Sequence, residues 1–360
     1  MSQLEYTSYL QLSKLLSAQS LESAKTGPAA HDEMLFIIIH QTYELWFKQI
    51  LFELDLIQDI FSGEAVDDAE LGRAVHAAER IVRIEHLLVS QIDILETMTP
   101  MDFLEFRNLL MPASGFQSEQ FRLIEVRMGL KREARLAFDG ASFDARLTDG
   151  GRTKVAAAEA KPSLRQQIDA WLSRTPFVDM GGYKFREAYE AALNAMLAQD
   201  MDVIRKHAHL SAAEKETQLA SLQKSRDMLD GLLDEKRFAQ LHKDGVWTFS
   251  RRALQAALFL FLYRDEPAAH SGYRMLKALM DMDETFALWR LRHALMVSRM
   301  LGRKVGTGGS SGYDYLRGTA DKHRAYNDLF AIATFLIPRS ALPALPEDVR
   351  KSMRYRYEGP

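Results

Sequence analysis

The sequence contains no cysteine among its 360 residues. Disulfide bonds, thiolate nucleophiles and cysteine ligands for a metal or haem iron are therefore excluded. Neither sign of charge is in clear excess, because the formal net charge is −3, so the composition does not indicate nucleic-acid binding. The longest apolar runs, such as residues 256–263, are too short to cross a bilayer.

The first residues lack the charged and apolar regions of a secretory signal peptide. With no membrane span expected either, we predict a soluble cytoplasmic protein. Hydrophobic residues make up 47% of the chain, which is enough to build one large or two moderate hydrophobic cores.

Apolar residues recur at helical spacing along nearly the whole chain, and no segment alternates as a strand would. Long helices are predicted over residues 31–61, 70–98 and 281–301. A further helix should begin at Thr99-Pro100, where a threonine cap precedes a proline at the first helical position. The predicted fold class is all-α.

No repeat, low-complexity tract or domain-dividing linker interrupts this pattern. We therefore predict a single large helical domain over residues 1–360. The N-terminal segment 1–20 is expected to be an arm, and the charge-rich region of about 185–245 a peripheral helical insertion. Glycines at 139–153 predict a surface loop there, and the prolines from Pro338 onward predict an irregular tail.

His293 and the glycine-rich segment that follows its helix form the most informative pattern. The histidine lies on a strongly apolar helix, and residues 306–312 supply four glycines together with Thr307 and two serines. Glycines let the backbone approach a ligand closely, and the hydroxyls can bind carboxylate or ammonium groups. A phosphate loop is excluded because no lysine follows the last glycine. A flexible linker and a structural core histidine remain open at this point.

His40 and Arg107 are the other candidates on apolar helix faces. His40 shares a face with Phe36, and a buried imidazole there needs a hydrogen-bond partner, such as the N–H of a ligand. Arg107 is aligned with Phe103 and Phe106. A guanidinium facing inward is costly unless it binds an anion, and a carboxylate is its natural bidentate partner. An internal salt bridge is the alternative.

The remaining histidines with charged or polar neighbours are predicted to lie at the surface. These are His76, His86, His207, His209, His242, His270 and His323. No carboxylate cluster or HExxH motif indicates a zinc or non-haem iron centre. A single axial histidine in an apolar pocket is instead typical of haem.

With these features in place, the sequence resembles the tryptophan 2,3-dioxygenase family over nearly its whole length. The matching stretches are residues 4–12, 31–38, 40–41, 44–46, 106–107, 114–118, 288–290 with His293, and 306–312. The central region of about 139–245 is similar to the longer animal-type members rather than to the short bacterial ones.

The resemblance implies an all-helical homotetramer that binds haem b. It implies a reaction in which L-tryptophan and O₂ give N-formyl-L-kynurenine, with cleavage of the indole C2–C3 bond. His293 matches the iron ligand, and Ser114 and Gly115 match residues beside the haem. His40 matches the distal histidine that accepts a hydrogen bond from the indole N–H.

The resemblance also implies a substrate site. Phe36 and Phe103 match its aromatic wall, Arg107 matches the partner of the substrate carboxylate, and Thr307 matches the contact to its ammonium and carboxylate groups. An N-terminal arm that completes the pocket of a neighbouring subunit is matched by Tyr6, Tyr9 and Leu10.

Other functions remain open beside this one. A related histidine-ligated haem oxygenase would act on another indole or aromatic substrate. A haem or tryptophan sensor would bind haem without turnover, and a helical interaction protein would bind no cofactor.

Overall fold

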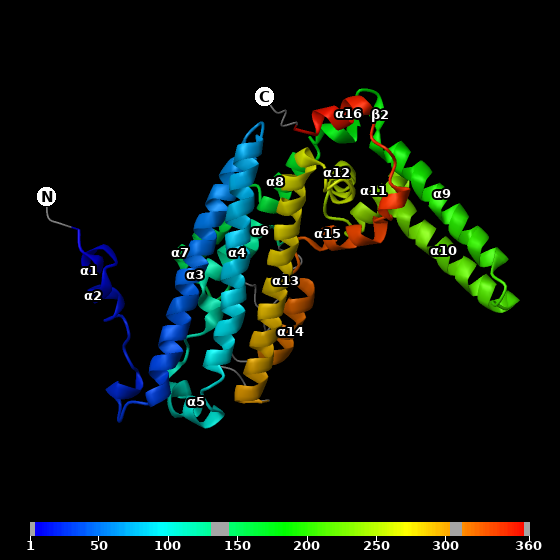
Figure 1. Ribbon diagram of the computed structural model, residues 1–360. Coiled ribbons are helices and arrows are strands. Elements are labelled where there is room, and N and C mark those ends of the chain that lie inside the picture. The colour runs from blue at the N-terminus through cyan, green and yellow to red at the C-terminus, as the bar shows by residue number, and fades with distance from the viewer. Residues whose placement is uncertain (1–3, 131–143, 303–311, 356–360) are drawn as a thin grey trace. The chain divides into compact units, whose positions relative to one another are not determined.

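The computed structural model describes residues 4–130, 144–302 and 312–355 (Figure 1). Within these ranges the regular structure is helical except for a two-stranded antiparallel ribbon, β1 (Asp179–Met180) with β2 (Tyr183–Lys184). The predicted all-α class is confirmed. Across the same ranges, no helix has both the length and the apolar character needed to cross a membrane.

The chain divides into two compact units. One comprises residues 1–55, 80–161 and 282–324, and the other comprises 56–79, 162–281 and 325–360. Three of the five boundaries fall inside long helices, namely α3 (His31–Ser62), α4 (Asp68–Leu95) and α13 (Pro267–Leu301). A single domain over 1–360 therefore stays a prediction.

The first unit packs the greater parts of α3 and α4 side by side (Figure 1). The buried Tyr43 hydroxyl on α3 donates to the backbone oxygen of Leu88 on α4 at 2.8 Å. The unit also contains α1 (Tyr6–Tyr9), α2 (Leu12–Leu15), α5 (Pro100–Arg107), α6 (Glu119–Met128), α7 (Asp149–Glu159), α14 (Gly312–Lys322) and the 3₁₀ turns η1 (Ser23–Lys25), η2 (Asn108–Leu110) and η3 (Gly115–Gln117).

Helix α5 begins where the sequence predicts. The Thr99 hydroxyl accepts from the Asp102 N–H, while the Asp102 carboxylate accepts from the Thr99 N–H at 3.1 Å. This reciprocal capping box satisfies two donors that the helix itself leaves unpaired.

The predicted loop at 139–153 is wrong in its last part, because α7 begins at Asp149 and includes Gly150 and Gly151. Thr148 caps the helix by accepting from the Gly151 N–H at 3.1 Å. A Cβ on Gly151 would lie 3.2 Å from Glu119 on α6. Gly151 therefore allows close packing of two helices rather than forming a loop.

The second unit contains the charge-rich insertion as an antiparallel pair, α9 (Phe185–Lys206) and α10 (Ala212–Leu233), drawn in green in Figure 1. The region is helical, and its role as a peripheral insertion in a single domain stays a prediction. The unit's other elements are α8 (Leu164–Leu172), α11 (Glu235–Lys243), α12 (Arg251–Leu262), α15 (Asn327–Ala331), α16 (Glu347–Ser352) and the turns η5 (Pro176–Val178), η6 (Ile332–Phe335) and η7 (Arg339–Ala341).

The start of α13 and the C-terminal tail differ from the sequence prediction. Helix α13 begins at Pro267 rather than near residue 281, because proline is well placed at the first helical position. It ends at Leu301 as predicted, and Gly302 follows with φ +57°. The tail after Pro338 is not wholly irregular, since α16 forms within it.

The core of the second unit is built on α12, which is apolar almost all round. Phe249, Leu254 and Phe259 are each fully buried. The residues just before this helix are held by the buried carboxylate of Asp328. It accepts hydrogen bonds from the N–H groups of Thr248 at 2.6 Å and Phe249 at 2.8 Å.

Replacing Asp328 with alanine should lower the free energy of unfolding by about 3 kcal/mol, because one buried and one part-buried N–H donor lose their acceptor. Equilibrium unfolding in urea measures the change. The matched control is Asp265→Ala, which breaks an exposed ion pair with Arg339 and should cost less than about 1 kcal/mol. Equal losses in both variants would contradict this assignment.

Candidate active site

A cavity of about 300 Å³ lies inside the first unit, between α3, α4, α5, α6, α13 and α14. Its wall is mostly aromatic and aliphatic, with a few polar groups. A largely apolar cavity with a small number of placed polar groups is typical of a small-molecule or cofactor site.

Six residues predicted as site residues line this cavity together: Phe36, His40, Phe103, Ser114, Gly115 and His293. Arg107 lies half-buried on α5, one turn beyond Phe103, and is not among the lining residues. Tyr6, Tyr9 and Leu10 are exposed on the N-terminal arm. Thr307 and the segment 303–311 lie outside the described residues.

One side of the cavity is an aromatic wall made by α3 and α5. The rings of Phe36 and Phe103 are stacked with their centroids 5.7 Å apart, and Phe106 meets Phe103 edge-on at 5.5 Å. Phe106 is fully buried behind them. The wall presents a flat apolar surface at which another ring can stack.

His40 lies on this side, with its ring centroid 4.1 Å from that of Phe36. Its Nδ1 is 2.7 Å from the backbone oxygen of Phe36. Since a carbonyl only accepts, Nδ1 must carry the hydrogen, and Nε2 is then the acceptor of the neutral ring. The ring is accessible from the cavity, but the enclosing protein desolvates it and lowers its pKa.

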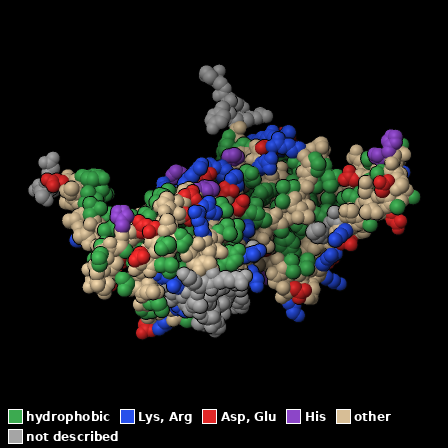
Figure 2. All heavy atoms as spheres, turned by 90° about the horizontal axis from the view of Figure 1, so that it is seen from below, with side chains coloured by type: hydrophobic (Ala, Val, Ile, Leu, Met, Phe, Trp, Pro, Cys, Tyr) green, Lys and Arg blue, Asp and Glu red, His purple; other side chains and the backbone are tan. Residues whose placement is uncertain are grey.

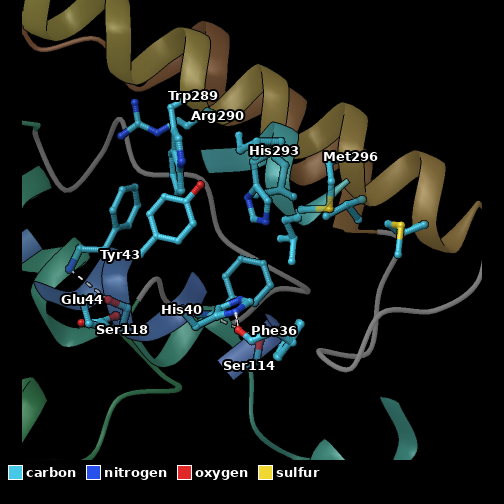
Figure 3. Close-up of a pocket in the computed structure, with 18 of the residues that line it drawn as sticks. Phe36, His40, Tyr43, Glu44, Ser114, Ser118, Trp289, Arg290, His293 and Met296 are labelled. Atoms are coloured by element: carbon cyan, nitrogen blue, oxygen red, sulfur yellow. Dashed lines mark hydrogen bonds between the residues drawn. The ribbon is translucent and has the colours of Figure 1, made fainter. Parts of the chain in front are cut away.

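His293 extends from α13 toward the side formed by His40 and Phe36 (Figure 3). Burial, and then the nearby His40, lower the pKa of His293 to about 4. The ring is therefore neutral at pH 7 and retains a lone pair. Its buried Nδ1 has no hydrogen-bond partner among the described residues.

Aromatic side chains support His293 from α13 and α3. The Trp289 ring, one turn earlier on α13, is stacked with that of His293 at 5.4 Å. Tyr43 meets Trp289 edge-on at 6.0 Å, and burial raises the pKa of Tyr43 to about 12. Helical spacing predicts that Trp289 shares a helix face with His293 and Tyr43 with His40, although the sequence alone assigns neither residue a role.

A buried charge cluster, which sequence reasoning missed, lies at another part of the cavity wall. Glu125 on α6 pairs with Arg122 at 2.9 Å and with Arg290 on α13 at 2.9 Å, and all three line the cavity. Burial alone would raise the pKa of Glu125. The two guanidiniums and the His323 ring outweigh burial and hold that pKa well below its usual range.

The prediction that His323 lies at the surface is wrong, because the residue is 3% exposed. Its Nδ1 lies 3.1 Å from the Glu125 carboxylate. Its charged and polar sequence neighbours suggest an exposed position, but the contact with Glu125 joins residues 198 positions apart and leaves no local signal. Glu44 was also missed; it lines the cavity and accepts from Gln120 at 2.8 Å.

Comparisons with known proteins all point to the same family, and they cover most of the chain. A family described as tryptophan 2,3-dioxygenase matches residues 1–336. A protein named tryptophan 2,3-dioxygenase from Alteromonas mediterranea is 47% identical over 97% of each chain. Proteins of the same name from Bdellovibrio bacteriovorus and Dictyostelium discoideum are 45% and 43% identical, over 98% of this chain and over 98% and 88% of their own lengths.

Replacing Glu125 with glutamine should lower the free energy of unfolding at pH 7 by about 3–5 kcal/mol, since two buried guanidiniums lose their carboxylate. The native pKa of Glu125 lies below the unfolded value, so its stabilisation is complete above pH 4.5 and declines as the pH falls further. The difference between variant and wild type should therefore shrink below pH 4.5.

Urea unfolding at pH 7 and at lower pH measures both effects. Asp93→Asn is the control, because Asp93 pairs with Arg292 at 2.5 Å but is 64% exposed. A pH-independent difference for Glu125→Gln would show that the carboxylate is not held ionised by this cluster.

Proposed function

This chain belongs to the tryptophan 2,3-dioxygenase family, and from that premise we propose the reaction of its active site. The protein is an oxidoreductase that cleaves the indole C2–C3 bond of L-tryptophan with O₂. Both oxygen atoms enter the product, N-formyl-L-kynurenine. The observation that carries the proposal is one apolar cavity with neutral histidines on two of its sides.

The donor groups of the cavity support binding of the haem on which the family depends. Among the described residues, no group of three or more histidine and acidic side chains could hold a bare metal ion. His293 instead offers a single buried, neutral imidazole in an apolar setting, which is the ligand set of a haem iron. We assign the cofactor as haem b, with His293 as iron ligand and Ser114 and Gly115 beside the macrocycle.

The substrate is assigned to the side of His40. The Nε2 atom of His40 accepts the indole N–H, because Nδ1 is already committed as a donor to the Phe36 backbone. The Phe36 and Phe103 rings form the wall against which the indole stacks. Arg107, on the same face of α5 as Phe103, pairs with the carboxylate, and Thr307 contacts the ammonium and carboxylate groups.

The residues of the chain position the reactants and exclude water. Bound haem supplies the oxygen chemistry, which no side chain here can provide. A hydrogen bond holds the indole, and a second contact holds the amino-acid group, so C2 and C3 are oriented before reaction. Substrate binding therefore supplies part of the entropic cost of reaching the transition state. The lowered pKa of His40 keeps Nε2 available as an acceptor at pH 7.

The N-terminal arm and the assembly complete the proposal. Tyr6, Tyr9 and Leu10 are exposed within their own subunit, and we assign them to the pocket of a neighbouring subunit in a homotetramer. The proposed location is the cytoplasm.

Product mass tests the reaction against its alternatives. Incubation of the haem-loaded protein with L-tryptophan, a reductant and ¹⁸O₂ should give a product that gains two labelled oxygen atoms. A gain of one oxygen would favour the related haem oxygenase, and haem binding without product would favour a sensor. Protein that acquires no Soret band would overturn the haem site.

His293→Ala should abolish haem retention, because no other imidazole is positioned to bind the iron from α13. His40→Ala should retain haem but lower kcat/KM for tryptophan at least tenfold, since the indole N–H loses its acceptor. Haem content per chain and steady-state rates measure the two effects. Loss of haem in His40→Ala with haem retained in His293→Ala would show that the two faces are assigned in reverse.

Arg107→Ala should raise the KM for L-tryptophan by roughly 10- to 150-fold, which corresponds to a lost charged hydrogen bond of about 1.5–3 kcal/mol. The inhibition constant of tryptamine, which lacks the carboxylate, should be unchanged by the same substitution. A similar rise for both compounds would remove Arg107 from the carboxylate contact.

A further inference from the structure

Glu33 is a fully buried carboxylate that the proposed chemistry does not use. It lies in the first turn of α3 and is 0% exposed. One carboxylate oxygen accepts from the backbone N–H of Glu22 at 2.7 Å, and the other accepts from the N–H of Ser23 at 3.0 Å and from its hydroxyl. The Ser23 hydroxyl in turn accepts from the Ala30 N–H at 2.9 Å. A buried charge of this kind is tolerated because donors surround it.

A second set of hydrogen bonds connects the segment before Glu22 to α3, two turns beyond Glu33. Gln41 donates to the backbone oxygen of Ala18 at 3.0 Å and accepts from the Gln19 side chain at 2.7 Å. Residues 18–23, which we name the arm root, are therefore held along α3 at both ends.

The chain before the arm root has little to hold it in its own subunit. Helices α1 and α2 contain four residues each, far fewer than an isolated helix needs for stability in water. Leu4, Tyr6, Tyr9 and Leu16 are each 69–74% exposed. Figure 1 shows α1 and α2 in dark blue, clear of α3, and Figure 2 shows apolar side chains at the surface of this arm, at the left edge of the view.

We propose that Glu33 is a positioning residue for the active site of a neighbouring copy of this chain. By clamping the arm root to α3, it sets the direction in which residues 4–16 leave the subunit to cover the neighbour's pocket. The inference deepens the proposed function, since it rests on the arm completing that pocket.

The placement of the clamp on α3 gives the proposal its physical basis. Glu33 and Gln41 lie on the same continuous helix as Phe36 and His40, which line the cavity. The arm root is therefore hydrogen-bonded to the same helix that forms part of the pocket wall. In a closed symmetric oligomer the same relation repeats in each copy, so an arm aimed correctly by one subunit meets an equivalent pocket in the next.

The direct test compares Glu33→Gln with Glu22→Gln in the haem-loaded protein. The Glu22 side chain is exposed and pairs only with Lys25 among the described residues, so its variant is the matched control. Glu33→Gln should raise the KM for L-tryptophan at least fivefold, with kcat and the Soret spectrum unchanged. Amide hydrogen exchange at residues 4–23 should become faster, whereas the control should match the wild type in every readout.

A merely structural role would instead lower haem content and kcat together, and that result would overturn the proposal. Ser23→Ala is the milder second variant, because it removes one donor and leaves the carboxylate in place. It should give a smaller rise in KM in the same direction; a wild-type KM in both Ser23→Ala and Glu33→Gln would also overturn the clamp.

Mixed oligomers separate this inference from the proposed arm itself. A chain lacking residues 1–12 keeps its pocket, and a His293→Ala chain keeps its arm, so their hybrids should regain activity. The double variant Glu33→Gln/His293→Ala should restore clearly less. Full activity of the truncated chain alone would refute the arm, whereas equal rescue by both donors would refute only the role of Glu33.

Discussion

The neutral imidazole of His293 is the group on which the rest of the site depends. Its buried Nδ1 finds no partner among the described residues, and burial lowers its pKa to about 4. A polar group in that condition is costly unless the functional state supplies something for the ring to bind. Trp289 and Tyr43 hold the ring by packing rather than by hydrogen bonds, which leaves its lone pair available for an iron.

The surrounding unit keeps this group in place through buried polar contacts that cross between helices. Glu125 joins α6 to α13 through Arg290, and Tyr43 joins α3 to α4. Removing one partner of such a contact costs more folding free energy than the intact pair contributes. The reason is that the other partner is then left buried and unpaired. The cavity wall therefore tolerates little local rearrangement, which suits a site that must orient a substrate.

The sequence predicts the parts of this account that have a local signal. Helical periodicity places His40, Phe36 and His293 on their faces, and the Thr99 cap marks the start of α5. Contacts between distant segments have no such signal, so His323 was misplaced and Glu125 was overlooked. Gly151 of α7 misleads for a related reason, since close packing against Glu119 and a loop both favour glycine.

Resonance Raman spectroscopy of the ferrous, haem-loaded protein tests the central claim most directly. The account predicts an iron–histidine stretching band that shifts when histidine carries ¹⁵N, disappears in His293→Gly and returns when free imidazole is added to that variant. A band that persists unchanged in His293→Gly without imidazole would show that another residue binds the iron, and would contradict the account.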